Sequence, residues 1–132
     1  MEIIITQWAL DSYLDMKHKQ IFRNQEYVEQ FRPNVLLLRD YLTAQEFDNQ
    51  KFWSPAKYKG KQIRNGFKMK WHQVGNGLVQ LRLPVALVND QAYLCAAYVK
   101  ENKKQEARQL AKFKTQLDLI QLQRFTECGR LS

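Results

Sequence analysis

The segment GFKMKWHQVGNGLVQLRLPV, residues 66–85, alternates apolar and polar side chains on both sides of a Gly-Asn-Gly turn. A period of two is typical of strands that bury one face. If Val74 lies opposite Leu78 across the turn, apolar pairs form on one face, namely Phe67–Val85, Met69–Leu83 and Trp71–Leu81. A shift of one residue would place every core side chain opposite a polar one. The pattern therefore predicts an antiparallel hairpin of well-defined register.

The same register makes the other face of the hairpin basic. Lys70 would lie opposite Arg82 and His72 opposite Gln80, with Lys68 on the same face. Like charges that face each other across a hairpin weaken it. We therefore expect that an anionic group belongs between Lys70 and Arg82.

The charge of the whole chain points to the same segment. Between Asn49 and Asn89 there is no Asp or Glu. The basic residues of this segment account for the net charge of +8, because those outside it equal the 13 acidic residues in number. They are Lys51, Lys57, Lys59, Lys61, Arg64, Lys68, Lys70 and Arg82. Folded surfaces usually mix both signs, so this segment favours a nucleic-acid partner over an ordinary solvated surface.

Other patterns predict an α+β domain over residues 1–132, with helices packed on a small antiparallel sheet. Before the hairpin we expect a strand at 2–6 and a helix of about three turns capped by Thr6. A second helix would start near Asn24, restart at Pro33 and reach Leu42, and a capping box at Thr43–Glu46 predicts a further short helix. The polar segment 49–65, broken by Pro55 and Gly60, reads as a basic loop.

After the hairpin we expect a third strand at 92–100, which completes a meander, and a helix at 103–122 whose apolar stripe docks on the sheet. The length of the turn at Asn89-Asp90 leaves the faces of the third strand undecided. Pro84 is unusual inside a strand and could mark a bulge. Residues 121–132 are expected to form a loose tail.

Several classes of protein are disfavoured by the sequence. The longest apolar runs, such as LPVALV, are far too short to cross a membrane, and the first residues do not resemble a secretory signal. Cys95 and Cys128 show no metal or redox spacing. We therefore expect a cytoplasmic protein with two reduced thiols and no membrane association.

The order of elements and the basic strand face resemble the RelE/ParE superfamily of toxin–antitoxin toxins, most closely its HigB-like branch. The resemblance covers roughly residues 63–119. LVQLRLPVALV is similar to the family strand that carries an arginine before an apolar run, and AYLCAAYVKENKKQEARQLAKFKTQL to its last strand, lysine-rich exit and following helix. Upstream, only the order of elements matches. The long segment 43–65, the tail and Pro84 depart from the pattern.

The resemblance implies a growth inhibitor silenced by a cognate antitoxin that wraps it. RelE- and HigB-like members cleave mRNA, usually on the ribosome, whereas ParE-like members poison DNA gyrase. We expect an endoribonuclease that uses neither metal nor cofactor. The alternatives are a gyrase inhibitor and a nucleic-acid-binding domain without enzymatic activity, since one scaffold can host all three.

Basic side chains could perform each step of RNA cleavage, because the reacting phosphate is anionic throughout. Arg82 could clamp phosphate oxygens, and Lys70 and His72 are candidates for proton transfer. The expected contacts to RNA phosphates come from Lys57, Lys59, Lys61, Arg64, Lys68, Lys100 and Lys104. Of these, the resemblance implies a functional role for Lys100. Tyr93 or Tyr98 could stack on a base.

Overall fold

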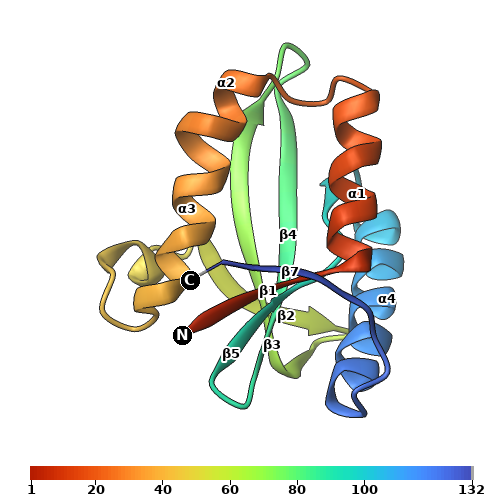
Figure 1. The fold of residues 1–132 in the computed structure, drawn as a ribbon. Coiled ribbons are helices and arrows are strands. Elements are labelled where there is room, and N and C mark those ends of the chain that lie inside the picture. Colours follow the sequence, from red (N-terminus) through yellow and green to blue (C-terminus); the bar gives the residue numbers. More distant parts are fainter. Residues whose placement is uncertain (132) are drawn as a thin grey trace.

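The computed structural model describes residues 1–131 and centres on the predicted hairpin, now β3 (Lys61–Val74) and β4 (Val79–Val88) (Figure 1). Phe67, Met69, Lys70 and Trp71 lie opposite Val85, Leu83, Arg82 and Leu81, so this part of the predicted register is confirmed. Nearer the turn the register shifts, and Val74 pairs with Val79 instead of Leu78. Gln73 has a positive φ of 57° at this bulge. The expected His72–Gln80 pair is therefore wrong.

The sheet is larger than expected and mixed rather than antiparallel. Its strand order is β2-β3-β4-β5-β1-β7, with β6 also paired to β4. Besides β3 and β4, the strands are β1 (Glu2–Thr6), β2 (Trp53–Tyr58), β5 (Gln91–Leu94), β6 (Tyr98–Lys100) and β7 (Glu127–Leu131). β1 runs parallel to β5, and the other pairs are antiparallel. The α+β class is confirmed, and the small antiparallel sheet is corrected to this one.

Two predicted irregular segments form strands. Residues 49–65 contain β2 and the start of β3, joined by a tight turn in which Lys59 and Gly60 both have positive φ. Pro55 is tolerated because β2 is an edge strand, where a missing N–H costs little. The tail 121–132 contains the end of α4 and β7, which pairs with β1. Arg130 of β7 forms ion pairs with Glu2 and Glu127, so this strand is anchored.

The predicted strand at 92–100 is divided into β5 and β6. Val88 pairs with Gln91 across a two-residue turn at Asn89-Asp90, where both residues have positive φ. The break at residues 95–97 lies beside Pro84, whose carbonyl accepts a hydrogen bond from the N–H of Cys95 at 3.0 Å. Pro84 has no N–H to offer the ladder, so β4 continues through it while its neighbour is interrupted.

Helices cover both faces of the sheet (Figure 1). On one face lie α1 (Gln7–His18) and a long helical segment composed of α2 (Asn24–Glu26), a π-helical turn (Tyr27–Phe31), α3 (Arg32–Leu36) and a 3-10 turn (Leu37–Asp40). The other face carries α4 (Lys103–Gln121). Within residues 1–131 no helix combines the length and apolar character needed to cross a membrane.

The helix ends show which local signals were correct. Thr6 caps α1, its hydroxyl oxygen accepting from the N–H of Ala9 at 3.2 Å, as predicted. Pro33 lies in the first turn of α3, so the expected restart is also confirmed. The capping box at Thr43 is wrong: the 3-10 turn Gln45–Asp48 has no side-chain cap, and the Thr43 hydroxyl donates to the carbonyl of Asp40.

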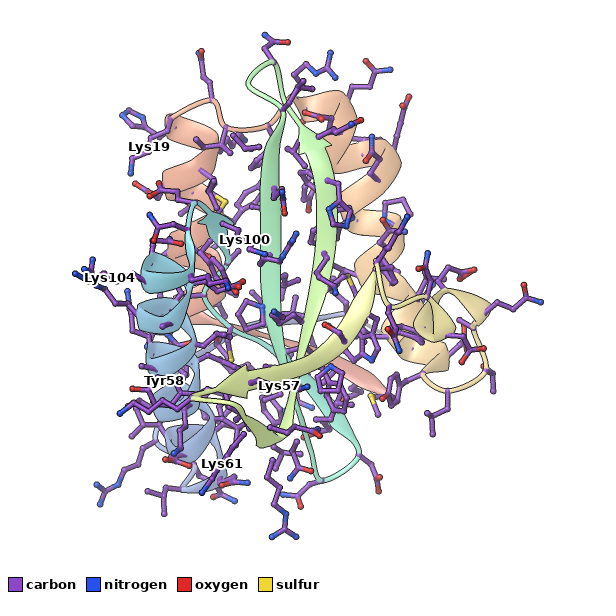
Figure 2. The ribbon with its side chains drawn as sticks, turned by 180° about the vertical axis from the view of Figure 1, so that it is seen from behind. Lys19, Lys57, Tyr58, Lys61, Lys100 and Lys104 are labelled. Carbon is purple, nitrogen blue, oxygen red and sulfur yellow. The ribbon has the colours of Figure 1, made fainter. Side chains whose placement is uncertain are left out.

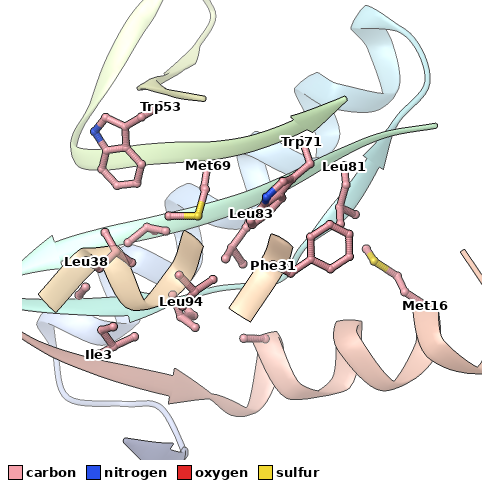
Figure 3. Close-up of a cluster of buried hydrophobic side chains, with 14 of the residues drawn as sticks. Ile3, Met16, Phe31, Leu38, Trp53, Met69, Trp71, Leu81, Leu83 and Leu94 are labelled. Carbon is pink, nitrogen blue, oxygen red and sulfur yellow. The ribbon is translucent and has the colours of Figure 1, made fainter. Parts of the chain in front are cut away.

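The core is split by the sheet into two clusters. Beneath α1 and the α2–α3 segment, residues such as Met16 and Phe31 pack on Met69, Trp71, Leu81 and Leu83 (Figure 3). Beneath α4, a second cluster joins Leu110, Phe113, Leu117 and Ile120 to Ile63 and Val88. The alternating apolar residues of β3 and β4 are buried in the first cluster. The basic residues between them therefore lie on the other face of the sheet, the one that α4 covers.

Glu26 fixes the tip of the β3–β4 hairpin to α2. Its carboxylate accepts hydrogen bonds from the backbone N–H groups of Gly75 (2.8 Å) and Arg23 (2.8 Å). A side chain at Gly75 would meet the carbonyl oxygen of Ile21 at 2.4 Å, so only glycine fits this approach. Burial alone would raise the pKa of Glu26, but these hydrogen bonds and the Arg23 guanidinium outweigh it and hold the pKa below its ordinary value of 4.5.

This anchor predicts a pH-dependent contribution to stability. A lowered carboxyl pKa stabilises the fold above about pH 4.5, and this contribution is lost as the pH falls through the folded-state pKa. We expect Glu26→Gln to reduce the free energy of unfolding by roughly 1.5–3 kcal/mol at pH 7, the range for hydrogen bonds to a charged group. Urea unfolding at several pH values measures it. A difference from the wild type that stays constant down to pH 3 would contradict the assignment.

Candidate nucleic-acid interface

Four cations from three strands meet on the face of α4. Lys68 and Lys70 come from β3, Arg82 from β4 and Lys100 from β6; we call these four residues the basic cluster. Pairing places them together, because Lys70 lies opposite Arg82 and the next residue of that face of β4, Gln80, lies opposite Lys100. Figure 2 shows Lys100 on this side of the sheet, beside the start of α4. The sequence prediction that Lys68, Lys70, Arg82 and Lys100 act in one place is thus consistent with their positions.

Arg82 is not placed as a phosphate clamp. Its side chain is buried, with the residue only 3% exposed. The guanidinium donates to the carbonyls of Leu81 (3.2 Å) and Trp71 (3.4 Å) and to the side-chain oxygen of Gln80 (2.7 Å). Protein acceptors therefore occupy donors that the sequence prediction assigned to a phosphate. What Arg82 supplies in this arrangement is a fixed positive charge beneath the lysines.

The pKa of both β3 lysines, Lys68 and Lys70, is lowered from its ordinary value. Burial is the largest cause of a lowered pKa at Lys70, followed by the charges of Lys68, Arg82 and Lys100. The pKa of Lys68 is also lowered, first by burial, although the carboxylate of Glu106 opposes the shift. The direction expected for Lys70 is therefore supported, but desolvation contributes more than the neighbouring arginine that motivated it.

Glu106 supplies the acid that the sequence of the hairpin lacks. It lies in the first turn of α4, and its side chain is 15% exposed. One carboxylate oxygen accepts from the hydroxyl of Tyr98 at 2.7 Å and lies 3.7 Å from Nζ of Lys68, and the other lies 4.0 Å from Nζ of Lys100. Sequence reasoning missed this contact. The available signal was that Glu106 lies four residues before Leu110, on the same stripe of α4 that packs on the sheet.

Tyr98 and Tyr93 are not available for base stacking. Tyr98 is only 3% exposed, and its hydroxyl is used by Glu106. Burial and that hydrogen bond raise the pKa of Tyr98 well above its ordinary range, so it stays a neutral donor. Tyr93 is also buried, with its ring edge-on to Phe125 and its hydroxyl donating to Gln91. The burial of both rings therefore counts against the stacking prediction.

His72 lies outside the cluster. The bulge after Trp71 takes it out of the paired register, and its side chain is exposed. Its Nε2 lies 2.8 Å from the carbonyl oxygen of Lys51, in the segment that precedes β2. The expectation that His72 works on the same face beside Lys70 and Arg82 therefore loses its geometric basis.

The remaining basic candidates are exposed and lie elsewhere. Lys57, Lys59, Lys61 and Arg64 belong to the β2–β3 hairpin, and Lys104 to the first turn of α4. In Figure 2, Lys57 and Lys61 lie towards the opposite end of this face from Lys100. Tyr58 holds two cations near its ring, with Nζ of Lys59 at 5.4 Å and Nζ of Lys114 at 5.9 Å. The hairpin end is thus a second basic surface and not part of the cluster.

Beside β6 lies a hollow that one residue of the basic cluster, Lys100, lines. This hollow of about 650 Å³ is lined by Gln80, Tyr98 and Lys100 from the sheet, Gln105 from α4, Lys19 just after α1, and the acidic residues Asp15 and Glu101. A separate pocket of about 220 Å³ on the opposite face is lined by apolar side chains with Arg32. Of these two, the first combines space for a ligand with a residue of the basic cluster, Lys100, so it is the better candidate site. Within residues 1–131, no three His, Cys, Asp or Glu side chains gather where they could hold a metal ion.

The role of Arg82 as a buried charge makes a prediction about its neighbours. Arg82→Gln removes a cation that lowers the pKa of both lysines, so the pKa of Lys70 and of Lys68 should rise towards the ordinary value of 10.5. Titration of the lysine side-chain ¹³C signals by NMR measures this, with thermal unfolding as the check that the variant folds. Unchanged titration of both lysines in a folded variant would show that Arg82 does not act on them.

Comparison with known proteins found no match to this chain among family models, curated proteins or solved structures. The residues that a function can be built on are those of the basic cluster with Glu106 and Tyr98. They bring several positive charges and the carboxylate of Glu106 together, and Tyr98 and Lys100 of this group line the open hollow.

Proposed function

We propose that this chain is a RelE/HigB-like toxin, an endoribonuclease that cleaves mRNA on or near the ribosome and thereby inhibits translation. One observation carries the proposal: Lys68, Lys70 and Lys100 gather around the buried charge of Arg82, and Lys100 also lines an open hollow. The order of elements, strand, helices, strands and a C-terminal helix, supports the same family. The protein would act in the cytoplasm and be silenced by a cognate antitoxin.

The cluster fits the electrostatics of RNA cleavage. In this reaction the 2′-oxygen bonds to phosphorus while the bond to the 5′-oxygen breaks, which leaves a 2′,3′-cyclic phosphate and a 5′-hydroxyl. Lys68 and Lys100 would hold the phosphate oxygens and stabilise the charge that develops on them. Lys70, whose charged form is disfavoured by burial and its neighbours, would give its proton to the departing 5′-oxygen. The proton of the 2′-hydroxyl passes to water.

The geometry changes the roles expected from the sequence. Arg82 becomes a residue that tunes the lysines, because its donors bind protein acceptors. His72 has no role in the proposed reaction, since its ring contacts the backbone of Lys51. These two changes also favour a second candidate function, a domain that binds nucleic acid without cleaving it. Gyrase inhibition is a third outcome that the test below can reveal.

Mapping of 5′-hydroxyl RNA ends minutes after induction in a bacterial host tests the proposal. We expect new ends inside coding regions with the wild type, and at least a hundredfold fewer with Lys70→Met, because general acid catalysis contributes roughly 10²–10⁴-fold. Lys61→Met is the matched control, an exposed lysine of β3 at the other basic surface, and should keep the cleavage. Both variants should unfold at nearly the wild-type temperature.

Each alternative gives a different result in this experiment. Intact transcripts with arrested growth and DNA damage signalling would replace the nuclease with gyrase inhibition. Intact transcripts with normal growth would leave the binding domain. New ends that persist in Lys70→Met would retain the nuclease and remove Lys70 from the reaction.

A further inference from the structure

We propose that the carboxylate of Glu106 occupies the position of a substrate phosphate, and that RNA displaces it from Lys68 and Lys100 on binding. This inference rests on the proposed function, because it places the RNA phosphate within the site. It assigns a phosphate subsite to the position between Lys68 and Lys100, next to the hollow that Lys100 lines, and gives Glu106 the role of a resident competitor.

Glu106 makes the two ammonium contacts that a phosphate would make, and a third contact, to the hydroxyl of Tyr98, that holds the carboxylate itself in place. Its oxygens face a tyrosine hydroxyl at 2.7 Å and two ammonium groups at 3.7 and 4.0 Å. Carboxylate and phosphate oxygens accept the same charge-assisted hydrogen bonds from such donors. The two ion-pair distances are long for direct hydrogen bonds, which leaves both lysines able to make shorter contacts with another anion.

The position of Glu106 in the chain allows the exchange. It lies in the first turn of α4, one turn before Leu110, the first buried residue of that helix. Lys100 is 38% exposed along its side chain and also lines the hollow, so an anion can reach it from solvent. The side chain of Glu106 can rotate away from Tyr98 without moving the buried stripe of α4, which begins at Leu110.

The charge balance of the basic cluster favours the replacement of Glu106 by RNA. Arg82, Lys68, Lys70 and Lys100 carry four positive charges when protonated, and Glu106 returns one negative charge. A phosphodiester brings one negative charge of its own and is followed by others along the strand. A single-stranded RNA can therefore replace the carboxylate and still neutralise more of the cluster.

Binding of a fluorescein-labelled single-stranded RNA of about 12 nucleotides tests the inference. Glu106→Gln keeps the shape of the side chain and removes its charge, so the RNA should bind roughly three- to tenfold more tightly at low salt. Asp118→Asn, the same change at an exposed position of α4, controls for net charge and should alter the affinity less than twofold.

Tyr98→Phe separates displacement from simple repulsion. It changes no charge at neutral pH but removes the hydroxyl that holds the carboxylate, so displacement becomes easier and the RNA should again bind more tightly. Tyr93→Phe, whose hydroxyl binds Gln91 instead, is its control and should bind as the wild type does. Tyr98→Phe also serves if Glu106→Gln does not fold.

The outcomes distinguish the two proposals. Weaker binding by folded Glu106→Gln or Tyr98→Phe would show that Glu106 positions the lysines, and would overturn the inference while RNA binding stands. If Glu106→Gln has no larger effect on RNA affinity than Asp118→Asn, and Tyr98→Phe binds as the wild type does, then Glu106 acts only through its long-range charge. That result would also overturn the inference. No RNA binding by the wild type or any variant would remove both proposals together.

Discussion

The pairing of β3 with β4 is the constraint on which the rest of the molecule depends. Burial of Met69, Trp71, Leu81 and Leu83 on one face forces the intervening residues to the other. Each of those apolar side chains contributes on the order of 1.5–3 kcal/mol when it leaves water. That sum exceeds the cost of bringing Lys70 opposite Arg82, so the hairpin can carry an unfavourable charge pair.

The remaining cost is offset in two ways, one within the hairpin and one from α4. Arg82 donates to backbone carbonyls and to Gln80, which satisfies a buried guanidinium without a direct carboxylate contact. Glu106 approaches from α4 and lies between Lys68 and Lys100, with Tyr98 fixing one of its oxygens. Within residues 1–131 no ion pair of this kind is formed by Lys70, which is therefore the least compensated of the three lysines.

Much of the fold follows from patterns within single elements. The hairpin register, the Thr6 cap, the restart at Pro33 and the apolar stripe of α4 were predictable, because each depends on neighbours a few residues apart. β2 and β7 were not. β2 is an edge strand interrupted by Pro55 and a bulge, and β7 is only half-buried, so neither shows a clear period of two. Their partners, β3 and β1, are what define them.

The candidate site divides in the same way. The alternation of β3 and β4 placed Lys68, Lys70 and Arg82 on one face, but it said nothing of depth, and the burial of Arg82 changes its role. The two-residue turn at Asn89-Asp90 decided the face of Tyr93, and the separate pairing of β6 with β4 decided that of Tyr98; the sequence left both open. Glu106 belongs to an element distant in sequence, so its contact with Lys68 emerges only from the packing of α4 on the sheet.

The central claim is that the basic cluster, and no other surface, receives the RNA. The most direct test is NMR mapping of the protein during titration with a short single-stranded RNA. We predict that the largest shifts occur at Lys68, Lys70, Lys100 and Glu106. Shifts confined to the β2–β3 hairpin, with its exposed Lys57, Lys59 and Lys61, would contradict the claim and move the interface to that second basic surface.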